Sequence, residues 1–142
     1  MMKISTKGQY ALLIMTDLAE MDNGKFISLK TLSLKHNLSI KYLEQILSQL
    51  SKSGFVTGLR GNNGGYKLTK KASEYTTGEI LRALEGDLAP LSAGNTNQKE
   101  DSYGNNTFWE AFEKNINDYV DSVSLEDLVL QNKQNIDYGW GI

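Results

Sequence analysis

The sequence predicts a mainly α-helical fold with one small β-hairpin. Apolar residues recur at helical spacing over much of the chain. Serine and threonine residues stand just before several of these stretches, where they can cap a helix. A single stretch near the middle, FVTGLRGNNGGYKL, has the strand and turn residues of a hairpin. At 142 residues, the chain is long enough to bury a substantial core.

Three helices are predicted before the hairpin. The first covers about residues 5–21, and its apolar face holds Ala11, Ile14, Met15, Leu18 and Ala19. A short second helix follows in ISLKTLSLKHNL, where the inward residues are Leu29, Leu32 and either Leu34 or Leu38.

The third predicted helix is SIKYLEQILSQLSKSG. Ser39 is a good N-cap for it, and Gly54 is a plausible C-cap. Its apolar face holds Leu43, Ile46, Leu47 and Leu50. Next, FVTGL and YKL form two strands around RGNNGG. Three helices followed by a hairpin is the order of a winged helix-turn-helix, which we assign to residues 1–75.

Residues 76–132 form a second region with three predicted elements. Thr76 and Glu79 make a capping box for a short helix, and Ser124 with Asp127 makes another for the last helix. Between them, a polar loop near 88–106 precedes a helix with an apolar stripe. The stripe contains Phe108, Phe112, Ile116, Tyr119 and Val120. Because it is too apolar for solvent, we expect part of it to pair across a two-fold axis. Residues 133–142 form a C-terminal tail.

Charge is distributed unevenly along the chain. Residues 1–71 hold 11 basic and 4 acidic side chains, a balance of +7, whereas residues 72–142 hold 4 and 13, a balance of -9. Such asymmetry favours a basic face that meets a polyanion, although chance clustering of solvated charges gives the same totals.

Several classes of site are excluded by composition. The chain has no cysteine and one histidine, which rules out disulfides, thiolate metal sites and Cys/His catalysis. The glycine-rich RGNNGGYKLT lacks the Lys-Ser/Thr pair of a phosphate-binding loop. We therefore predict no enzyme, no metal and no cofactor. The apolar run ALLIM is too short for a membrane span, so we expect a cytoplasmic protein without membrane contact.

A candidate DNA-reading surface lies on the third helix and the hairpin. The exposed face of the helix carries Ser39, Lys41, Tyr42, Glu44, Gln45, Ser48 and Gln49, whose polar groups suit base edges in the major groove. Arg60 stands at the tip of a strand among small residues, where a side chain can enter a narrow minor groove. An ordinary solvated helix and an ordinary tight turn have similar sequences, and only their adjacency favours DNA.

The stretches MKISTKGQYAL, SIKYLEQILSQLSKSGFVTGLRGNNGGYKL and TTGEILRALEG together resemble the Rrf-two superfamily of bacterial regulators. This resemblance implies a dimeric winged-helix DNA binder whose long C-terminal helix pairs with its twin. It also implies DNA contacts by position. They are Ser39, Lys41, Tyr42, Glu44 and Gln45 in the helix, Arg60, Gly61 and Asn62 in the wing, and Lys3, Thr6 and Lys7 near phosphates.

Iron–sulphur members of this superfamily carry three cysteines in the loop that here reads SAGNTNQKEDSYGNN. Their absence implies that this chain does not sense a cluster. In MKISTKG, RALEGDLAPL and SLEDLV, the chain is similar to cysteine-free members that repress cysteine and sulphur-assimilation genes. In those repressors, the signal comes through a complex with cysteine synthase, the enzyme that uses O-acetylserine.

The C-terminal DYGWGI resembles the tails of serine acetyltransferases, which insert a terminal isoleucine into cysteine synthase. By that resemblance, Tyr138, Trp140, Gly141 and Ile142 are candidate partner-binding residues. The alternative is that Trp140 and Ile142 pack on the dimer's own surface.

Two other functions remain open from sequence. One is a regulator of other genes that binds a small molecule directly. The other is a protein-interaction module whose winged helix no longer binds DNA, against which the basic first half and Arg60 argue.

Overall fold

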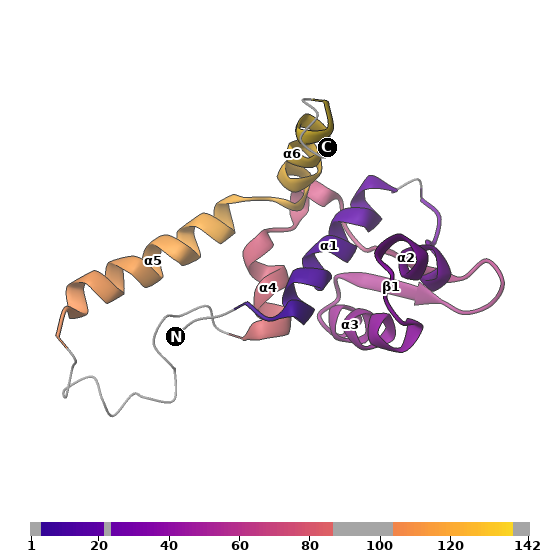
Figure 1. Cartoon of the computed structure of the whole chain (residues 1–142), viewed down its shortest axis with the longest axis horizontal. Coiled ribbons are helices and arrows are strands. Elements are labelled where there is room, and N and C mark those ends of the chain that lie inside the picture. Colours follow the sequence, from indigo (N-terminus) through magenta and orange to yellow (C-terminus); the bar gives the residue numbers. More distant parts are fainter. Residues whose placement is uncertain (1–3, 22–23, 87–103, 138–142) are drawn as a thin grey trace.

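A computed structural model describes residues 4–21, 24–86 and 104–137. Three helices come first: α1 (Thr6–Glu20), α2 (Leu29–His36) and α3 (Ile40–Lys52). The hairpin β1 (Val56–Leu59) and β2 (Gly65–Leu68) follows, then the short 3-10 helix η1 (Ala72–Glu74) and α4 (Thr77–Glu85). The described chain ends with α5 (Asn106–Ser122) and α6 (Leu125–Asp137). The predicted class, a winged helix-turn-helix followed by C-terminal helices, is confirmed (Figure 1).

The core forms where α1, α3 and the hairpin meet. Helical periodicity places apolar side chains of α1 and α3 on facing surfaces, and seven residues from other segments complete the cluster. Its members are Ala11, Ile14, Met15, Leu18, Ile27, Leu32, Leu43, Ile46, Leu47, Leu50, Val56, Leu68, Tyr75, Ile80 and Leu125. The core therefore crosses the predicted boundary at residue 75, because α4 and α6 both pack on α1. The division into functional regions remains a prediction.

Serine side chains begin the first three helices, as the sequence indicates. Ser5, Ser28 and Ser39 each accept a hydrogen bond from a backbone N–H in the first turn of the helix that follows. At the end of α3, Ser53 is the C-cap and Gly54 follows it with φ +78°. Gly54, which was predicted as the C-cap, therefore stands one residue beyond the observed C-cap, in the left-handed conformation that glycine adopts without strain.

The structure also decides or corrects several local predictions. In α2, Leu34 is 74% exposed, and Leu38 is the residue that packs against the core. The capping box at Thr76 is only half formed, since the Glu79 carboxylate bonds the Thr76 hydroxyl and not its N–H. The box at Ser124 and Asp127 is complete.

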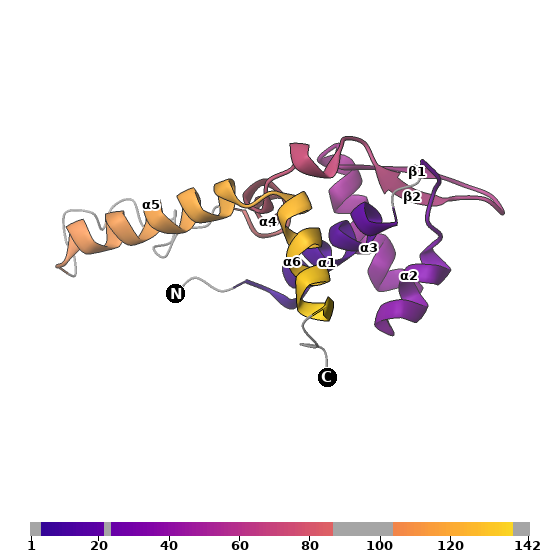
Figure 2. The same cartoon turned by 90° about the horizontal axis from the view of Figure 1, so that it is seen from above.

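The C-terminal helices differ from the sequence expectation mainly at their ends. Helix α6 continues to Asp137, into the segment predicted as tail, and α5 begins at Asn106, the last residue of the predicted loop. Most of that loop lies outside the described residues. Helix α5 leads away from the other helices in both views, whereas α6 returns to lie on α1 (Figures 1 and 2). Within the described ranges, no helix is both long and apolar enough to traverse a bilayer.

Candidate nucleic-acid interface

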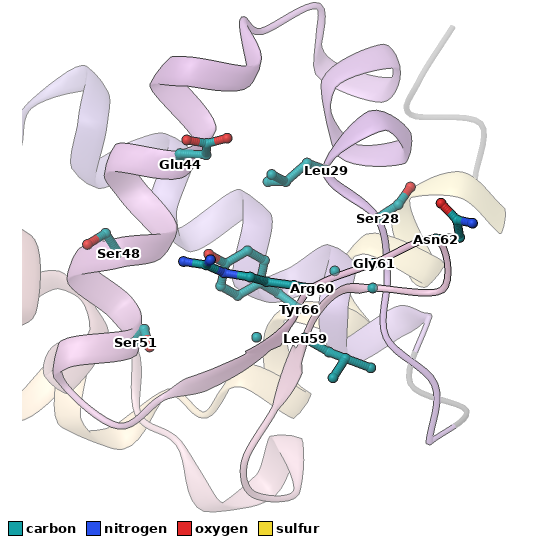
Figure 3. Close-up of a pocket in the computed structure, with 13 residues that line it drawn as sticks. Ser28, Leu29, Glu44, Ser48, Ser51, Leu59, Arg60, Gly61, Asn62 and Tyr66 are labelled. Atoms are coloured by element: carbon teal, nitrogen blue, oxygen red, sulfur yellow. The ribbon is translucent and has the colours of Figure 1, made fainter.

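A groove of about 820 Å³ lies between α3 and the hairpin (Figure 3). One wall is the exposed face of α3, with Glu44, Ser48 and Ser51, and the start of α2 adds Ser28 and Leu29. The hairpin contributes Gly58, Leu59, Arg60, Gly61, Asn62, Gly64, Gly65 and Tyr66. Four of the predicted DNA contacts, namely Glu44, Arg60, Gly61 and Asn62, thus share one groove.

The exposed face of α3 is a consequence of how the helix packs. Because Leu43, Ile46, Leu47 and Leu50 are fully buried, the opposite face must project outward. That face exposes Lys41, Glu44, Gln45 and Ser48, which together can donate and accept hydrogen bonds. Lys41 and Gln45 are not among the residues that line the groove.

Ser39 and Tyr42 have structural contacts in addition to their predicted roles. The hydroxyl of Ser39 accepts the N–H of Tyr42 at 3.1 Å, as the N-cap of α3. The Tyr42 ring is half-buried and meets the Tyr10 ring edge-on at 6.1 Å between centroids. A change at either residue would therefore disturb packing or capping as well as any DNA contact.

The wing presents Arg60 on a backbone that requires glycine. Arg60 is exposed, and its guanidinium points toward α3 (Figure 3). Within the described residues, no carboxylate comes within ion-pair distance of it, so its charge is available to a ligand. Gly61 has φ +110°, and a Cβ at Gly64 would lie 2.1 Å from the Leu59 carbonyl oxygen. Side chains at these two positions would distort the turn that carries Arg60.

The start of α2 is tied to the wing by backbone pairing that the sequence does not show. Ile27 N–H donates to the Tyr66 carbonyl at 2.8 Å, and Tyr66 N–H donates to the Ile27 carbonyl at 2.9 Å. Gly65 allows this approach, since a Cβ there would lie 2.0 Å from the Ile27 carbonyl oxygen. Ser28, Leu29 and Tyr66 consequently join the groove, although no local pattern predicted them.

A buried carboxylate fixes α2 on α1. Asp17 is 3% exposed; Lys35 Nζ lies 2.8 Å from its Oδ1, and His36 Nε2 contacts its Oδ2. The hydrogen bond to Asp17 is the main reason that the pKa of Lys35 is raised above its usual value. The helix before α3 is thereby held by charge as well as by Leu32.

The start of α1 carries the remaining predicted contacts. Thr6 is exposed and Lys7 half-buried, while Lys3 lies outside the described residues. The Glu85 carboxylate, from the end of α4, accepts the backbone N–H of Ser5 at 2.8 Å. Thr6 and Lys7 therefore belong to a segment whose position is fixed by α4.

The predicted dimer stripe is divided between two environments. Phe108, Phe112 and Tyr119 are 57%, 39% and 66% exposed, whereas Ile116 and Val120 are half-buried. Phe108 and Phe112 cluster with Trp109, with ring centroids 4.9–5.9 Å apart. The predicted partner-binding residues Tyr138, Trp140, Gly141 and Ile142 lie outside the described residues.

Comparison with known proteins finds transcriptional regulators by family model, by sequence and by structure. Residues 4–131 match the family model described as "Rrf2: Iron-dependent Transcriptional regulator". The regulator CymR of Bacillus subtilis is 38% identical over 127 residues, which is 89% of each chain. A solved structure of B. subtilis CymR has a TM-score of 0.81 at 37% identity and covers 92% of this chain and 98% of its own. The T. potens IscR structure has a TM-score of 0.72 at 34% identity, covering 92% and 88%.

The family description mentions iron, and the residues of this chain do not fit a thiolate-ligated cluster. There is no cysteine in the 142 residues. Across the described ranges, no three His, Cys, Asp or Glu residues gather as a metal site would require.

The chain belongs to the Rrf2 family of transcriptional regulators. It carries the family's winged-helix DNA-binding fold and lacks the cysteines that ligate a cluster.

Proposed function

We propose that this Rrf2-family chain is a homodimeric repressor of cysteine and sulphur metabolism genes that binds a palindromic operator through α3 and the wing. The observation that carries the proposal is the 38% identity to CymR over nearly the whole chain. That relative, CymR, is described as the global cysteine regulator of B. subtilis. The absence of cysteine favours a CymR-like role over cluster sensing.

In this proposal, the exposed polar groups of α3 read bases and the wing reads groove shape. Glu44 and Gln45 face base edges in the major groove, and Arg60 enters the adjacent minor groove. The other predicted residues contact the DNA phosphate backbone or support Glu44, Gln45 and Arg60. They are Lys3, Thr6, Lys7, Ser39, Lys41, Tyr42, Gly61 and Asn62. Exposure of Glu44, Gln45 and Arg60 supports these roles.

The exposed stripe on α5 supports the proposed dimer. Three large aromatic rings, those of Phe108, Phe112 and Tyr119, are exposed in the single chain. Exposed apolar patches of this kind mark interfaces. A two-fold dimer that spans adjacent major grooves would place two copies of α3 about 34–36 Å apart, which requires a palindromic site.

Selection of bound DNA from a random pool tests the DNA and gene assignments together. We expect a palindrome that occurs upstream of cysteine or sulphur metabolism genes in the source genome. A palindrome found only upstream of unrelated genes would contradict the metabolic role, and failure to enrich any sequence would contradict DNA recognition itself.

The proposed signal is a complex with cysteine synthase through the C-terminal tail. The terminal Ile142 carboxylate would occupy the place of the amino-acid substrate's carboxylate, and Tyr138, Trp140 and Gly141 would contact the rim. The support is the likeness of DYGWGI to serine acetyltransferase tails. Because O-acetylserine competes for the same site, its accumulation would release the regulator and lower its affinity for the operator.

Calorimetry with purified cysteine synthase tests this complex. Deletion of Ile142 should abolish binding while leaving the fold and dimer unchanged, and O-acetylserine should displace the intact protein. The matched control is a change on the exposed side of α6, such as Glu126→Gln, which should bind as the intact protein does. Equal binding by the Ile142 deletion would contradict the docking proposal and favour packing of the tail on the dimer.

A further inference from the structure

The body of the protein is here the part formed by α1 to α4, the hairpin, η1 and α6. Helix α5 is attached to this body chiefly by its C-terminal half. No residue of its 17 is buried. Figures 1 and 2 show its N-terminal end far from the other helices, whereas its last turns lie beside α4. Among the described elements, α4 is therefore the main contact that orients α5.

One of these contacts is a forked ion pair. Arg82 on α4 places Nη1 2.7 Å from Oδ1 of Asp121 and Nη2 3.1 Å from Oδ2. The same Nη2 donates to the side-chain oxygen of Asn117 at 2.6 Å. A bidentate pair fixes direction as well as distance, so it constrains rotation of α5 about its own axis. The guanidinium also lowers the pKa of Asp121, chiefly through the hydrogen bond from Arg82.

Thr77, the first residue of α4, adds a second anchor. Its N–H donates to the carbonyl of Val123 at 2.8 Å. Its hydroxyl lies 2.6 Å from the same carbonyl oxygen and 3.0 Å from that of Val120. Since Thr77 is buried, these bonds satisfy the last carbonyls of α5, which have no partner within the helix.

Gly78 makes room for the ion pair. A Cβ at this position would lie 2.2 Å from Asp121 Oδ1 and 2.9 Å from Arg82 Nη1. Glycine is unfavourable inside a helix compared with alanine. Gly78 is the second residue of α4, and the close approach of the Asp121 carboxylate accounts for glycine at this position.

We propose that the Arg82–Asp121 pair, seated on Gly78, positions α5 relative to the winged helix and thereby sets the spacing between the two operator half-sites. This inference rests on the proposed dimer. Helix α5 is long enough for a small tilt to change the spacing between half-sites. A helix of this length spans about 25 Å, so a tilt of about 10° at the anchored end moves the other end by about 4 Å. One base-pair step is about 3.4 Å.

The contact itself is tested by a distance within one protomer. Because the chain has no cysteine, spin labels can be placed at Lys52→Cys on α3 and Glu110→Cys on α5 alone, both of which are exposed. Labelled chains are diluted with excess unlabelled protein. We expect a narrow distance distribution in the parent, and a broader or shifted one after Asp121→Asn.

Asp118→Asn is the matched control. It is the same substitution one turn earlier in α5, and Asp118 pairs with Lys114 on the same helix, not with α4. It should leave the distribution unchanged. Gly78→Ala should act like Asp121→Asn although alanine favours the helix, and the double variant should be no worse than the singles, because all three changes remove one contact.

The consequence for DNA is tested with operators whose half-sites are moved apart or together by one base pair. The parent and Asp118→Asn should prefer one spacing, whereas Asp121→Asn should bind the three spacings with nearly equal affinity. An unchanged distance distribution in both Asp121→Asn and Gly78→Ala would overturn the positioning role. A broadened distribution with unchanged spacing preference would overturn the link to the operator. A parent that binds no palindrome would instead contradict the proposed function.

Discussion

The winged-helix body and helix α5 differ in how the apolar face of an amphipathic helix is covered. In the body, the apolar face of α3 is fully buried by residues of the same chain. Helix α5 has a comparable stripe and no buried residue. Amphipathic helices owe most of their stability to the packing of the apolar face. The apolar face of α3 is thus covered within one chain, whereas the stripe of α5 is not buried by the described residues, and we propose that a second copy of the chain covers it.

The helix ends show the same contrast. Serine side chains cap the N-termini of the first three helices. Asn105, before α5, has φ +60° and makes no side-chain capping bond. Local signals therefore account for the starts of the first three helices, and no side-chain capping bond marks the start of α5. The following predictions test that difference.

The largest effect is expected from a cavity in the body. Ile46→Ala removes a side chain that is 0% exposed, and it should lower the free energy of unfolding by about 2–5 kcal/mol. Phe112→Ala in α5 should change the unfolding of the body little and should weaken the dimer instead. Urea unfolding at several protein concentrations separates the two, and an equal, concentration-independent loss in both variants would contradict the comparison.

A smaller loss is expected from Tyr75→Phe. The Tyr75 hydroxyl donates to the Phe55 carbonyl at 2.7 Å and accepts the N–H groups of Thr69 and Lys70 at 3.0 and 3.1 Å. Its removal takes away the partner of the Lys70 N–H, whereas the Thr69 N–H and the Phe55 carbonyl still bond each other at 3.3 Å. We expect a cost of about 1–3 kcal/mol in unfolding free energy for the buried donor that is left unpaired. Denaturant unfolding measures the loss, and a change below about 0.5 kcal/mol, the usual range for surface positions, would show that water replaces the hydroxyl.

Caps should matter in the body and not at α5. Ser39→Ala should cost about 1 kcal/mol, because it removes the bond to Tyr42 N–H. Asn105→Gly should be neutral or slightly stabilising, since glycine accepts the positive φ and no capping bond is lost. Thermal unfolding of the two variants is the measurement, and a larger loss at Asn105 would contradict the assignment of local signals to the body.

The smallest effect is expected from the ion pair between Asp17 on α1 and Lys35 on α2. Because Asp17 raises the pKa of Lys35, this pair stabilises the fold below the unfolded pKa of about 10.5 and loses its effect as pH rises through the folded value. Stability of the parent should therefore fall more steeply above about pH 10.5 than that of Lys35→Gln. Parallel slopes for the two proteins would show that the pair contributes nothing measurable.

Much of the body follows from local sequence patterns. The 3.6-residue period of α3, its Ser39 cap and the glycine-rich hairpin were sufficient to predict the winged helix, since each signal lies within a few residues. The resemblance of the chain to a known superfamily pointed to the same fold, which the comparisons confirm.

Contacts between distant segments could not be predicted in the same way. The pairing of Ile27 with Tyr66, which brings the start of α2 into the groove, depends on how the wing folds back. Nothing in the local sequence around Gly78 indicates a special role, and only the structure shows the Asp121 carboxylate beside it. A period fixes which face of a helix is apolar, but it does not identify the surface that covers that face.

The measurement that most directly tests the central claim is the affinity of the intact dimer, Glu44→Ala and Gln45→Ala for the selected operator and for random DNA of equal length. Each variant should lose about 1–3 kcal/mol on the operator and little on random DNA, because the lost contact is to a base edge. Lys7→Ala is the control: it should weaken both DNAs alike and reduce the salt slope by about one. Equal losses on both DNAs for Glu44→Ala and Gln45→Ala would contradict the role of α3 as the reader of sequence.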